Sequence, residues 1–366
     1  MKVDCLQESL KKSLNIVAKA IPKKTVLPAL SNVLVSIQSD KIKLTASDRE
    51  LTISCSLDVI PEENMLLVEE KVEFLVPAQF IKLIDSLPSC SVTLETKDTK
   101  LIVKSPKTNS SFNTQPGEDF PVSSPVNGKS FYITSTLLKE SLNLVVFAAS
   151  SDLSRPVLHG VLMKSENGTM KMAGADGYQL AVKTLQIGID ESISTIISKN
   201  SLDEVKRALP NEEVVVKITV SDNDISFKIG DNINITVKRW GGEYPSYESL
   251  IPKSHSTKTK VDSNGLLKAI RTVMAMSKDK NVITMNVKQD KITFSVWTEI
   301  GESTSEVDAK TEGEDITIVC NGDYLDSFLS IIQSEDLETE ITFDGSKKPI
   351  LFTIGEDYKY VVMPMG

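Results

Sequence analysis

The chain has 366 residues, of which 40% are apolar and 25% charged, and its formal net charge is −9. This composition is typical of a folded protein and excludes a disordered or fibrous chain, while the length suggests two to four domains. The acidic balance argues against a protein that binds nucleic acid over its whole surface, but it does not tell how the charge is distributed.

Cysteine usage and hydropathy indicate the compartment. The four cysteines form no CxxC pair and lie far apart, at Cys5, Cys55, Cys90 and Cys320. Buried, reduced thiols are therefore expected. No apolar run approaches the roughly 18 residues that span a bilayer, and the N-terminus lacks an apolar signal core. We expect a cytoplasmic protein without membrane contact.

The first predicted element is an amphipathic helix within residues 7–24. Its apolar residues recur at steps of four, three and four, at Leu10, Leu14, Val17 and Ile21. Similar stripes follow within residues 134–151 and 262–280. Leu10, Leu138 and Leu266 are each 128 residues apart, which indicates an internal repeat.

A shorter helix follows each long one, within residues 78–88, 199–210 and 321–333. Their equivalent apolar residues, Leu83, Val205 and Phe328, are 122 and 123 residues apart. Prolines mark the start of the first of these helices (Pro77) and the ends of the first two (Pro88 and Pro210). A second landmark with nearly the same spacing makes accidental repetition improbable.

Short segments between the helices alternate apolar and polar residues, as in residues 33–37, 41–45, 214–218 and 291–295. Turn formers join several of them, at Ser39-Asp40, Asn167-Gly168 and Gln289-Asp290, which predicts antiparallel hairpins. Each repeat is therefore an α+β unit with two helices packed on an antiparallel sheet. Polar, turn-rich linkers at 123–128 and 252–257 divide the chain into domains at 1–125, 126–253 and 254–366.

The sequence lacks a recognisable catalytic or metal-binding motif. There is no HExxH, P-loop, GxGxxG or GxSxG motif, and the two histidines, His159 and His255, lie in different repeats. His159 follows a strand-like run from Pro156 and is expected at a sheet surface. Asp48 and Asp176, 128 residues apart, could pair as catalytic carboxylates, but their place before a turn favours backbone hydrogen bonding. We expect no catalytic residue, metal or cofactor.

Positive charge is concentrated in the predicted helices. The six helical segments contain 14 Lys or Arg and 9 Asp or Glu, a net +5, so the rest of the chain carries −14. Each cation alone is typical of a solvated helix face, but together they could face phosphates: Lys11, Lys12, Lys19, Lys23, Lys24, Lys82, Lys139, Lys199, Lys206, Arg207, Lys268 and Arg271. No motif for reading bases is present, so contact would be with the backbone and independent of sequence.

Motifs along the whole chain carry a family resemblance. They are residues 26–34, 154–161, 175–181, 243–247 with 251–252, and 360–365, the last reading Tyr-Val-Val-Met-Pro-Met. In order and spacing they resemble the bacterial DNA polymerase III β subunit family, the replicative sliding clamps.

The resemblance implies a head-to-tail homodimeric ring, in which three DNA-clamp domains from each chain surround double-stranded DNA. The helices would line the hole, and weak, salt-screened phosphate contacts would allow sliding. Lys24 and Arg155 match family positions that approach DNA. At the dimer seam, Phe112 in the first domain and Ala275 and Met276 in the third match family contact positions, although an ordinary loop edge would explain Phe112 equally well.

A groove between the second and third domains is also implied, where short peptides of the replicative polymerase, the clamp loader and repair proteins would bind. Its residues, carried over position by position, are Leu158, Ala175, Gly177, Tyr178, Leu180, Pro245, Leu250, Asn321, Tyr324, Val361, Met363, Pro364 and Met365. Adaptable Leu and Met side chains suit a shared docking groove. Gly366, Gln179 and Ser249 depart from the family pattern, which would remove donors and charge near the groove.

Three hypotheses follow. The first is a DNA sliding clamp without catalytic activity. The second is a three-repeat scaffold that oligomerises and binds proteins but not DNA, and the basic helix layer argues against it. The third is a hydrolase or transferase with an unrecognised site, and the missing catalytic motifs argue against that.

Overall fold

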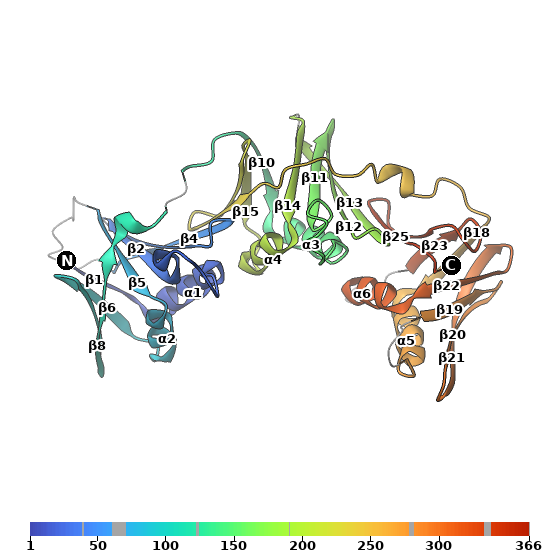
Figure 1. Cartoon of the computed structure of the whole chain (residues 1–366), viewed down its shortest axis with the longest axis horizontal. Helices are drawn as coiled ribbons and strands as arrows, with labels where there is room; N and C mark the ends of the chain where they lie inside the picture. Colours follow the sequence, from blue (N-terminus) through green and yellow to red (C-terminus); the bar gives the residue numbers. More distant parts are fainter. Residues whose placement is uncertain are drawn as a thin grey trace. The chain divides into compact units, whose positions relative to one another are not determined.

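The computed structural model describes residues 1–38, 40–60, 71–121, 124–189, 191–277, 282–332 and 338–365. The chain forms two compact units (Figure 1). Unit 1 contains residues 1–137 and 204–239, and unit 2 contains residues 138–203 and 240–366. Parts of the sequence predictions, namely Ser39, residue 123, residues 278–280, residue 333 and Gly366, lie outside the described residues.

Unit 1 is built on two antiparallel sheets. The four-stranded sheet has the order β1 (Lys2–Leu6), β6 (Ser91–Lys97), β7 (Lys100–Ser105) and β8 (Thr108–Asn113). The nine-stranded sheet has the order β10 (Lys129–Thr134), β15 (Val215–Val220), β16 (Asp224–Ile229), β17 (Ile233–Lys238), β4 (Leu51–Asp58), β3 (Lys41–Ser47), β2 (Asn32–Gln38), β5 (Val72–Pro77) and β9 (Gln115–Pro116). The pairing of β17 with β4 joins strands from the first and second repeats into one sheet.

Two helices of the first repeat, α1 (Gln7–Val17) and α2 (Gln79–Ser86), contact each other in unit 1. Leu10, Leu14 and Val17 are fully buried, as the apolar stripe predicts. The predicted helical position of Ile21 is wrong, because after a 3₁₀ turn at Ala18–Ala20 this residue is extended, with φ −81° and ψ 119°. Pro22 follows it, and the residue before a proline disfavours the helical region.

Unit 2 contains a twelve-stranded sheet. Its order is β14 (Ile193–Ser198), β11 (Gly160–Glu166), β12 (Gly168–Ala175), β13 (Gln179–Ile189), β25 (Tyr358–Val362), β24 (Ile350–Ile354), β23 (Glu338–Phe343), β18 (Thr257–Asp262), β21 (Gly301–Gly313), β20 (Lys291–Thr298), β19 (Val282–Val287) and β22 (Ile316–Asn321). Helices α5 (Ser263–Met274) and α6 (Gly322–Ile332) pack against each other (Figure 1). The residues of α3 (Ser135–Val146) and α4 (Lys199–Ala208) are divided between the two units.

The strand registers confirm the internal repeat. In unit 1, Leu34 of β2 pairs with Thr45 of β3, and in unit 2, Leu162 of β11 pairs with Ala173 of β12, each 128 residues further on. The predicted hairpin turn at Asn167-Gly168 is present with positive φ at both residues, as a two-residue turn requires. Three clamp-type α+β repeats, each with antiparallel strands, are thereby confirmed. The domain boundaries at 125 and 253 stay predictions.

The predicted thiols are free, and Cys5, Cys55 and Cys320 are buried, whereas Cys90 is half-buried. Burial raises the pKa of Cys5 and of Cys320 to about 12. In the parts of the chain given above, no helix is long and apolar enough to span a membrane.

Candidate functional site

Most of the predicted groove residues lie together in unit 2. Leu158, Ala175, Leu180 and Val361 belong to one apolar cluster, and Leu180 of β13 is paired directly with Val361 of β25. Strands from the second and third repeats therefore form one continuous apolar floor.

The rim of the groove is apolar and open. Tyr178, Leu250, Met363 and Met365 are between 39 and 60% exposed. Met363 N donates a hydrogen bond to Tyr178 O (2.8 Å), and Met365 N donates one to Val319 O (2.8 Å). The backbone of the C-terminal segment is thus anchored on both sides, while its methionine side chains remain accessible. Pro245 is exposed and Pro364 is half-buried beside this segment.

The loop at the edge of the groove is shaped by Asp176. Its Oδ1 accepts hydrogen bonds from Tyr178 N (2.8 Å) and Gln179 N (2.9 Å), and Gly177 between them has φ 98°. Asp48 accepts the equivalent pair of backbone bonds in unit 1, from residues 50 and 51, at 2.9 and 2.7 Å. Both carboxylates therefore act as turn formers, which confirms the backbone hydrogen bonding expected for them.

Gln179 supports the groove from below. Its Oε1 accepts a hydrogen bond from Tyr360 Oη (2.6 Å), and its Nε2 donates one to Asp176 Oδ2 (2.9 Å). Gln179 is buried, so the prediction that this position governs polar donors facing a peptide is wrong. Ser249 is exposed, and its hydroxyl donates to Ser246 O (3.1 Å).

Asn321 and Tyr324 lie at the start of α6. Asn321 Oδ1 accepts a hydrogen bond from Asp323 N (2.9 Å), and Tyr324 O accepts one from Tyr360 Oη (3.0 Å). Burial and the neighbouring Asp176 carboxylate raise the pKa of Tyr324 to about 12. Tyr324 therefore stays neutral at physiological pH beside the loop of residues 175–178.

His159 differs from its prediction. It lies in a turn before β11 and is 4% exposed rather than lying at a sheet surface. Its Nδ1 lies 2.9 Å from Ser150 O, and its ring stacks on Trp240 at 5.3 Å between centroids. The backbone N–H groups of Leu158 and His159 both donate to Arg155 O, which forms a turn where a strand was predicted. His159 is therefore a packed residue of the core and not a base.

The positive charge of the helices is smaller than predicted. The six α-helices contain nine Lys or Arg and seven Asp or Glu, a net +2 rather than +5. The difference arises because Lys19, Lys23 and Lys24 follow the end of α1, while Lys278 and Lys280 lie outside the described residues. Net helix charge alone is a weak argument for binding DNA.

The candidate cations fall into two groups. Lys11 pairs with Asp85 (3.6 Å), Arg207 with Glu204 (2.5 Å), and Lys199 donates to two carbonyl oxygens at the end of α3. Lys12, Lys24, Lys82 and Lys268 are exposed, and no ion pair among the described residues involves them. The second group is better placed to meet phosphates.

The remaining candidates occupy intermediate settings. Lys139 and Lys206 are half-buried, and burial lowers the pKa of Lys19, which Glu204 counteracts. Arg155 is exposed, and its Nη1 lies 3.3 Å from the position that a Cβ would take on Gly177. This arginine is therefore beside the groove loop.

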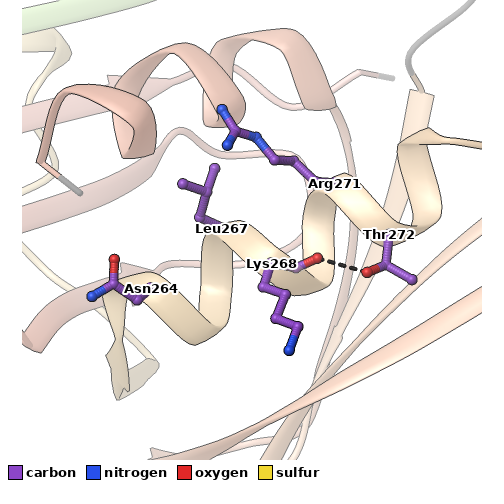
Figure 2. Close-up of a pocket in the computed structure, with 5 residues that line it drawn as sticks. All are labelled: Asn264, Leu267, Lys268, Arg271 and Thr272. Atoms are coloured by element: carbon purple, nitrogen blue, oxygen red, sulfur yellow. Dashed lines mark hydrogen bonds between the residues drawn. The ribbon is translucent and has the colours of Figure 1, made fainter.

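A pocket of about 730 Å³ on α5 separates two cations (Figure 2). Arg271 points toward α6, where its Nε donates to Asp326 Oδ1 (2.5 Å) and its Nη2 to Ser330 Oγ (2.8 Å). Lys268 points away from α6, and its carbonyl accepts a hydrogen bond from the Thr272 hydroxyl (2.8 Å). Arg271 therefore joins two helices, and Lys268 is the cation of α5 that is open to a ligand.

Two strand edges lack a partner strand among the described residues. β8 ends its sheet and pairs only with β7. β21 pairs with β20 along 301–308 but with β18 only from Ala309 onward, so its first half also has one open edge. Phe112, on β8, packs edge to face on Phe80 at 5.8 Å. Sequence periodicity missed the β21 edge, because the strand is polar and alternates weakly.

Ala275 and Met276 follow α5 near the start of β21. Ala275 is exposed, and Met276 is half-buried with its Cε 3.6 Å from the position that a Cβ would take on Gly301. The two predicted seam residues of the third repeat therefore lie beside the open edge of β21.

Family models match the chain in three consecutive segments. They describe the DNA polymerase III beta subunit, with its N-terminal domain at residues 1–124, its central domain at 132–246 and its C-terminal domain at 248–366. The Beta sliding clamp of Bacillus subtilis (strain 168) is 26% identical, with 98% of this chain and 97% of that protein covered. That of Staphylococcus aureus is 27% identical, with coverages of 94% and 93%.

Solved structures agree with the three models. The DNA polymerase sliding clamp from Bacillus subtilis has a TM-score of 0.92 and 25% identity, with 100% of this chain and 99% of that chain covered. The DNA polymerase III subunit beta from Pseudomonas aeruginosa has a TM-score of 0.91 and 25% identity, with both chains covered completely. The chain belongs to the DNA polymerase III beta subunit family and is a DNA sliding clamp, a processivity factor and not an enzyme.

Proposed function

We propose that two copies of the chain close head to tail into a ring around double-stranded DNA. The observation that supports the ring best is the pair of open strand edges, one in each unit. An unpaired edge presents free N–H and C=O groups, and an edge of another chain can satisfy them. Pairing β8 of one copy with β21 of the next, at both seams, would leave neither edge exposed.

The charges near the two edges are complementary. The β7–β8 hairpin carries Lys100, Lys104 and Lys107, whereas the open half of β21 carries Glu302, Glu306 and Asp308. Two of these charges already have partners within the chain, since Lys104 pairs with Glu95 and Glu306 with Lys291. The others are exposed and would select a head-to-tail pairing over a head-to-head one.

Duplex DNA would be held by a few exposed cations rather than by a dense basic surface. Lys12, Lys24, Lys82 and Lys268 would contact phosphates, with Lys19, Lys139, Arg155 and Lys206 nearby. Contacts of this kind are salt-dependent and independent of sequence. Because a closed ring restrains DNA by its topology, each contact can be weak and still permit sliding.

The groove of unit 2 would bind short peptides of the replicative polymerase, the clamp loader and repair proteins. Its apolar floor is continuous across two strands, and its rim consists of exposed Tyr, Leu and Met side chains. Such a surface offers little polar selectivity but can adapt to different apolar anchors. The groove thereby explains how one clamp could serve several partners.

The seam can be tested by charge reversal in the full chain. A Lys100→Glu/Lys107→Glu chain and a Glu302→Lys/Asp308→Lys chain should each be monomeric in analytical ultracentrifugation, because both seams of either homodimer would oppose like charges. Mixed in equal amounts, the two chains should form a heterodimer, since both of its seams then join opposite charges. Dimers of each variant alone, or no recovery on mixing, would contradict the β8–β21 seam.

A further inference from the structure

The junction between the first and second repeats contains a pocket on the same part of the sheet as the groove of unit 2. It measures about 230 Å³ and lies in unit 1 over β2, β3, β4 and β17, beside residues 124–126. Five of the hydroxyl side chains that line it are only 6 to 9% exposed: Ser36, Thr45, Thr52, Ser54 and Thr236. We call these five residues with Asn234, Lys43 and Lys71 the hydroxyl pocket.

Strand registers show that this pocket is the internal counterpart of the groove floor. Thr52 pairs with Thr236 across β4 and β17, as Leu180 pairs with Val361 across β13 and β25. Part of the cluster is retained, since Leu30, Leu34, Leu75 and Phe120 match Leu158, Leu162, Ile196 and Tyr247. The other matched positions replace an apolar residue with a hydroxyl: Ala173 by Thr45, Ala175 by Ser47, Leu180 by Thr52, Val182 by Ser54, Leu351 by Ser226 and Val361 by Thr236.

Six replacements of the same kind change what the surface can bind. An apolar peptide anchor would gain no burial against a hydroxyl floor and would leave polar groups unsolvated. Thr45 Oγ1 and Ser54 Oγ are 2.9 Å apart, and Ser47 Oγ and Thr52 Oγ1 are 2.7 Å apart. Each such pair uses one hydroxyl proton and leaves the second available, so the floor can still donate hydrogen bonds.

Lysines at the pocket determine the charge of its ligand. Lys71 pairs with Glu73 (2.6 Å), so the Glu73 carboxylate that also lines the pocket is neutralised. Lys43 is exposed on β3, and no ion pair among the described residues involves it. The lining therefore combines several hydroxyl donors, the Asn234 amide and one uncompensated positive charge, which suits a ligand with several acceptor oxygens and negative charge.

We propose that the hydroxyl pocket binds a phosphate-type oxyanion, either inorganic phosphate or the phosphate group of a small ester. The tetrahedral oxyanion accepts hydrogen bonds from the Thr and Ser hydroxyls of β3, β4 and β17 and pairs with the Lys43 ammonium. The clamp then has two different sites on equivalent surfaces, an apolar groove at the second junction and an oxyanion site at the first.

Equilibrium dialysis of the full chain with radiolabelled inorganic phosphate, at constant ionic strength, tests this site. The expected result is one saturable phosphate per chain. Lys43→Met should weaken binding roughly tenfold, the loss that about 1.4 kcal/mol produces. The matched control is Lys171→Met, the exposed lysine at the equivalent position of β12, which should bind as the unsubstituted chain does.

A second variant tests the floor. Thr52→Leu/Thr236→Val installs the residues of the unit 2 groove and should abolish phosphate binding while the unfolding temperature and peptide binding are retained. Ser36→Ala, a milder change, guards against misfolding and should weaken binding several-fold. Competition by glycerol phosphate identifies an ester as the ligand, whereas its failure to compete identifies inorganic phosphate. Absence of saturable binding, equal loss in Lys171→Met, or equal competition by acetate would overturn the proposal.

Discussion

Gln179 and Tyr360 show how single polar residues support an apolar groove. The Tyr360 hydroxyl donates to Gln179 Oε1 and lies 3.0 Å from Tyr324 O, and its ring stacks on Phe328 at 4.5 Å. The loop residue Asp176 is linked to the same network through Gln179 Nε2. These contacts join β13, β25 and α6 beneath the floor, so residues that no peptide would touch hold the groove together.

The Tyr360→Phe variant should therefore lower the free energy of unfolding by about 1–3 kcal/mol, because it leaves two buried acceptors without a donor. Urea unfolding followed by circular dichroism measures this effect. Tyr132→Phe, at a tyrosine that is 61% exposed, is the matched control and should change little. Equal stability of the two variants would contradict the supporting role of the network.

Thiol reactivity gives a second test at this scale. At pH 8 the half-buried Cys90 should react with a disulfide reagent first, because burial raises the pKa of Cys5 and of Cys320 to about 12 and keeps them protonated. As the pH rises toward 12, reaction of the buried thiols should accelerate in addition to any gain from unfolding. A Cys90→Ser chain that still loses one thiol rapidly at pH 8 would contradict this order.

Elements position the cations more than their sequence does. On α5 the two cations lie one turn apart, yet Arg271 is bound to α6 while Lys268 points away from it (Figure 2). Periodicity places both residues off the apolar stripe and cannot distinguish them, since the difference depends on Asp326 and Ser330 of another helix. The same limit explains why Lys11 and Arg207 were grouped with exposed lysines.

Lys268→Ala should reduce the dependence of DNA affinity on salt, lowering the slope of log K against log salt by about 0.9 if one phosphate contact is lost. Arg271→Ala should leave that slope unchanged and instead lower stability, because Asp326 and Ser330 lose their partner. Affinity titrations at several salt concentrations compare the two variants. A larger slope change for Arg271→Ala would reverse the assignment.

The C-terminal segment is the element that completes the groove. Deletion of residues 363–366 removes two exposed methionines and the backbone bonds to Tyr178 and Val319. Binding of a polymerase-derived peptide should be abolished while the dimer mass is unchanged. Leu6→Ala, at an exposed leucine of unit 1, serves as the control and should bind the peptide normally. Retained peptide affinity in the deletion would refute the site.

The sequence predicted the repeat, the antiparallel hairpins and the apolar residues of the groove, because these follow from periodicity, turn chemistry and motifs. It did not predict that α1 ends before Ile21, where the effect of Pro22 outweighs the apolar period. Nor could it predict that His159 is buried against Trp240, or that β21 has an open half, since both depend on residues distant in the chain. Pairing between strands, rather than local pattern, decides these features.

At the scale of the whole molecule, the three repeats share a fold but differ in what their junctions offer. The first junction has a hydroxyl floor, the second an apolar one, and the open edges of β8 and β21 would supply the third junction by joining two chains. Closure around DNA then follows from strand pairing, not from strong attraction to phosphate. The net helix charge of only +2 is consistent with a clamp that slides.

Retention on DNA tests the ring most directly. The full chain would be loaded by its cognate loader onto nicked circular DNA, washed in high salt, and followed after the circle is cut once. We predict that the protein stays on the circle and leaves the linear form, since an encircling protein escapes only over an end. Retention on both forms, or on neither, would contradict encirclement.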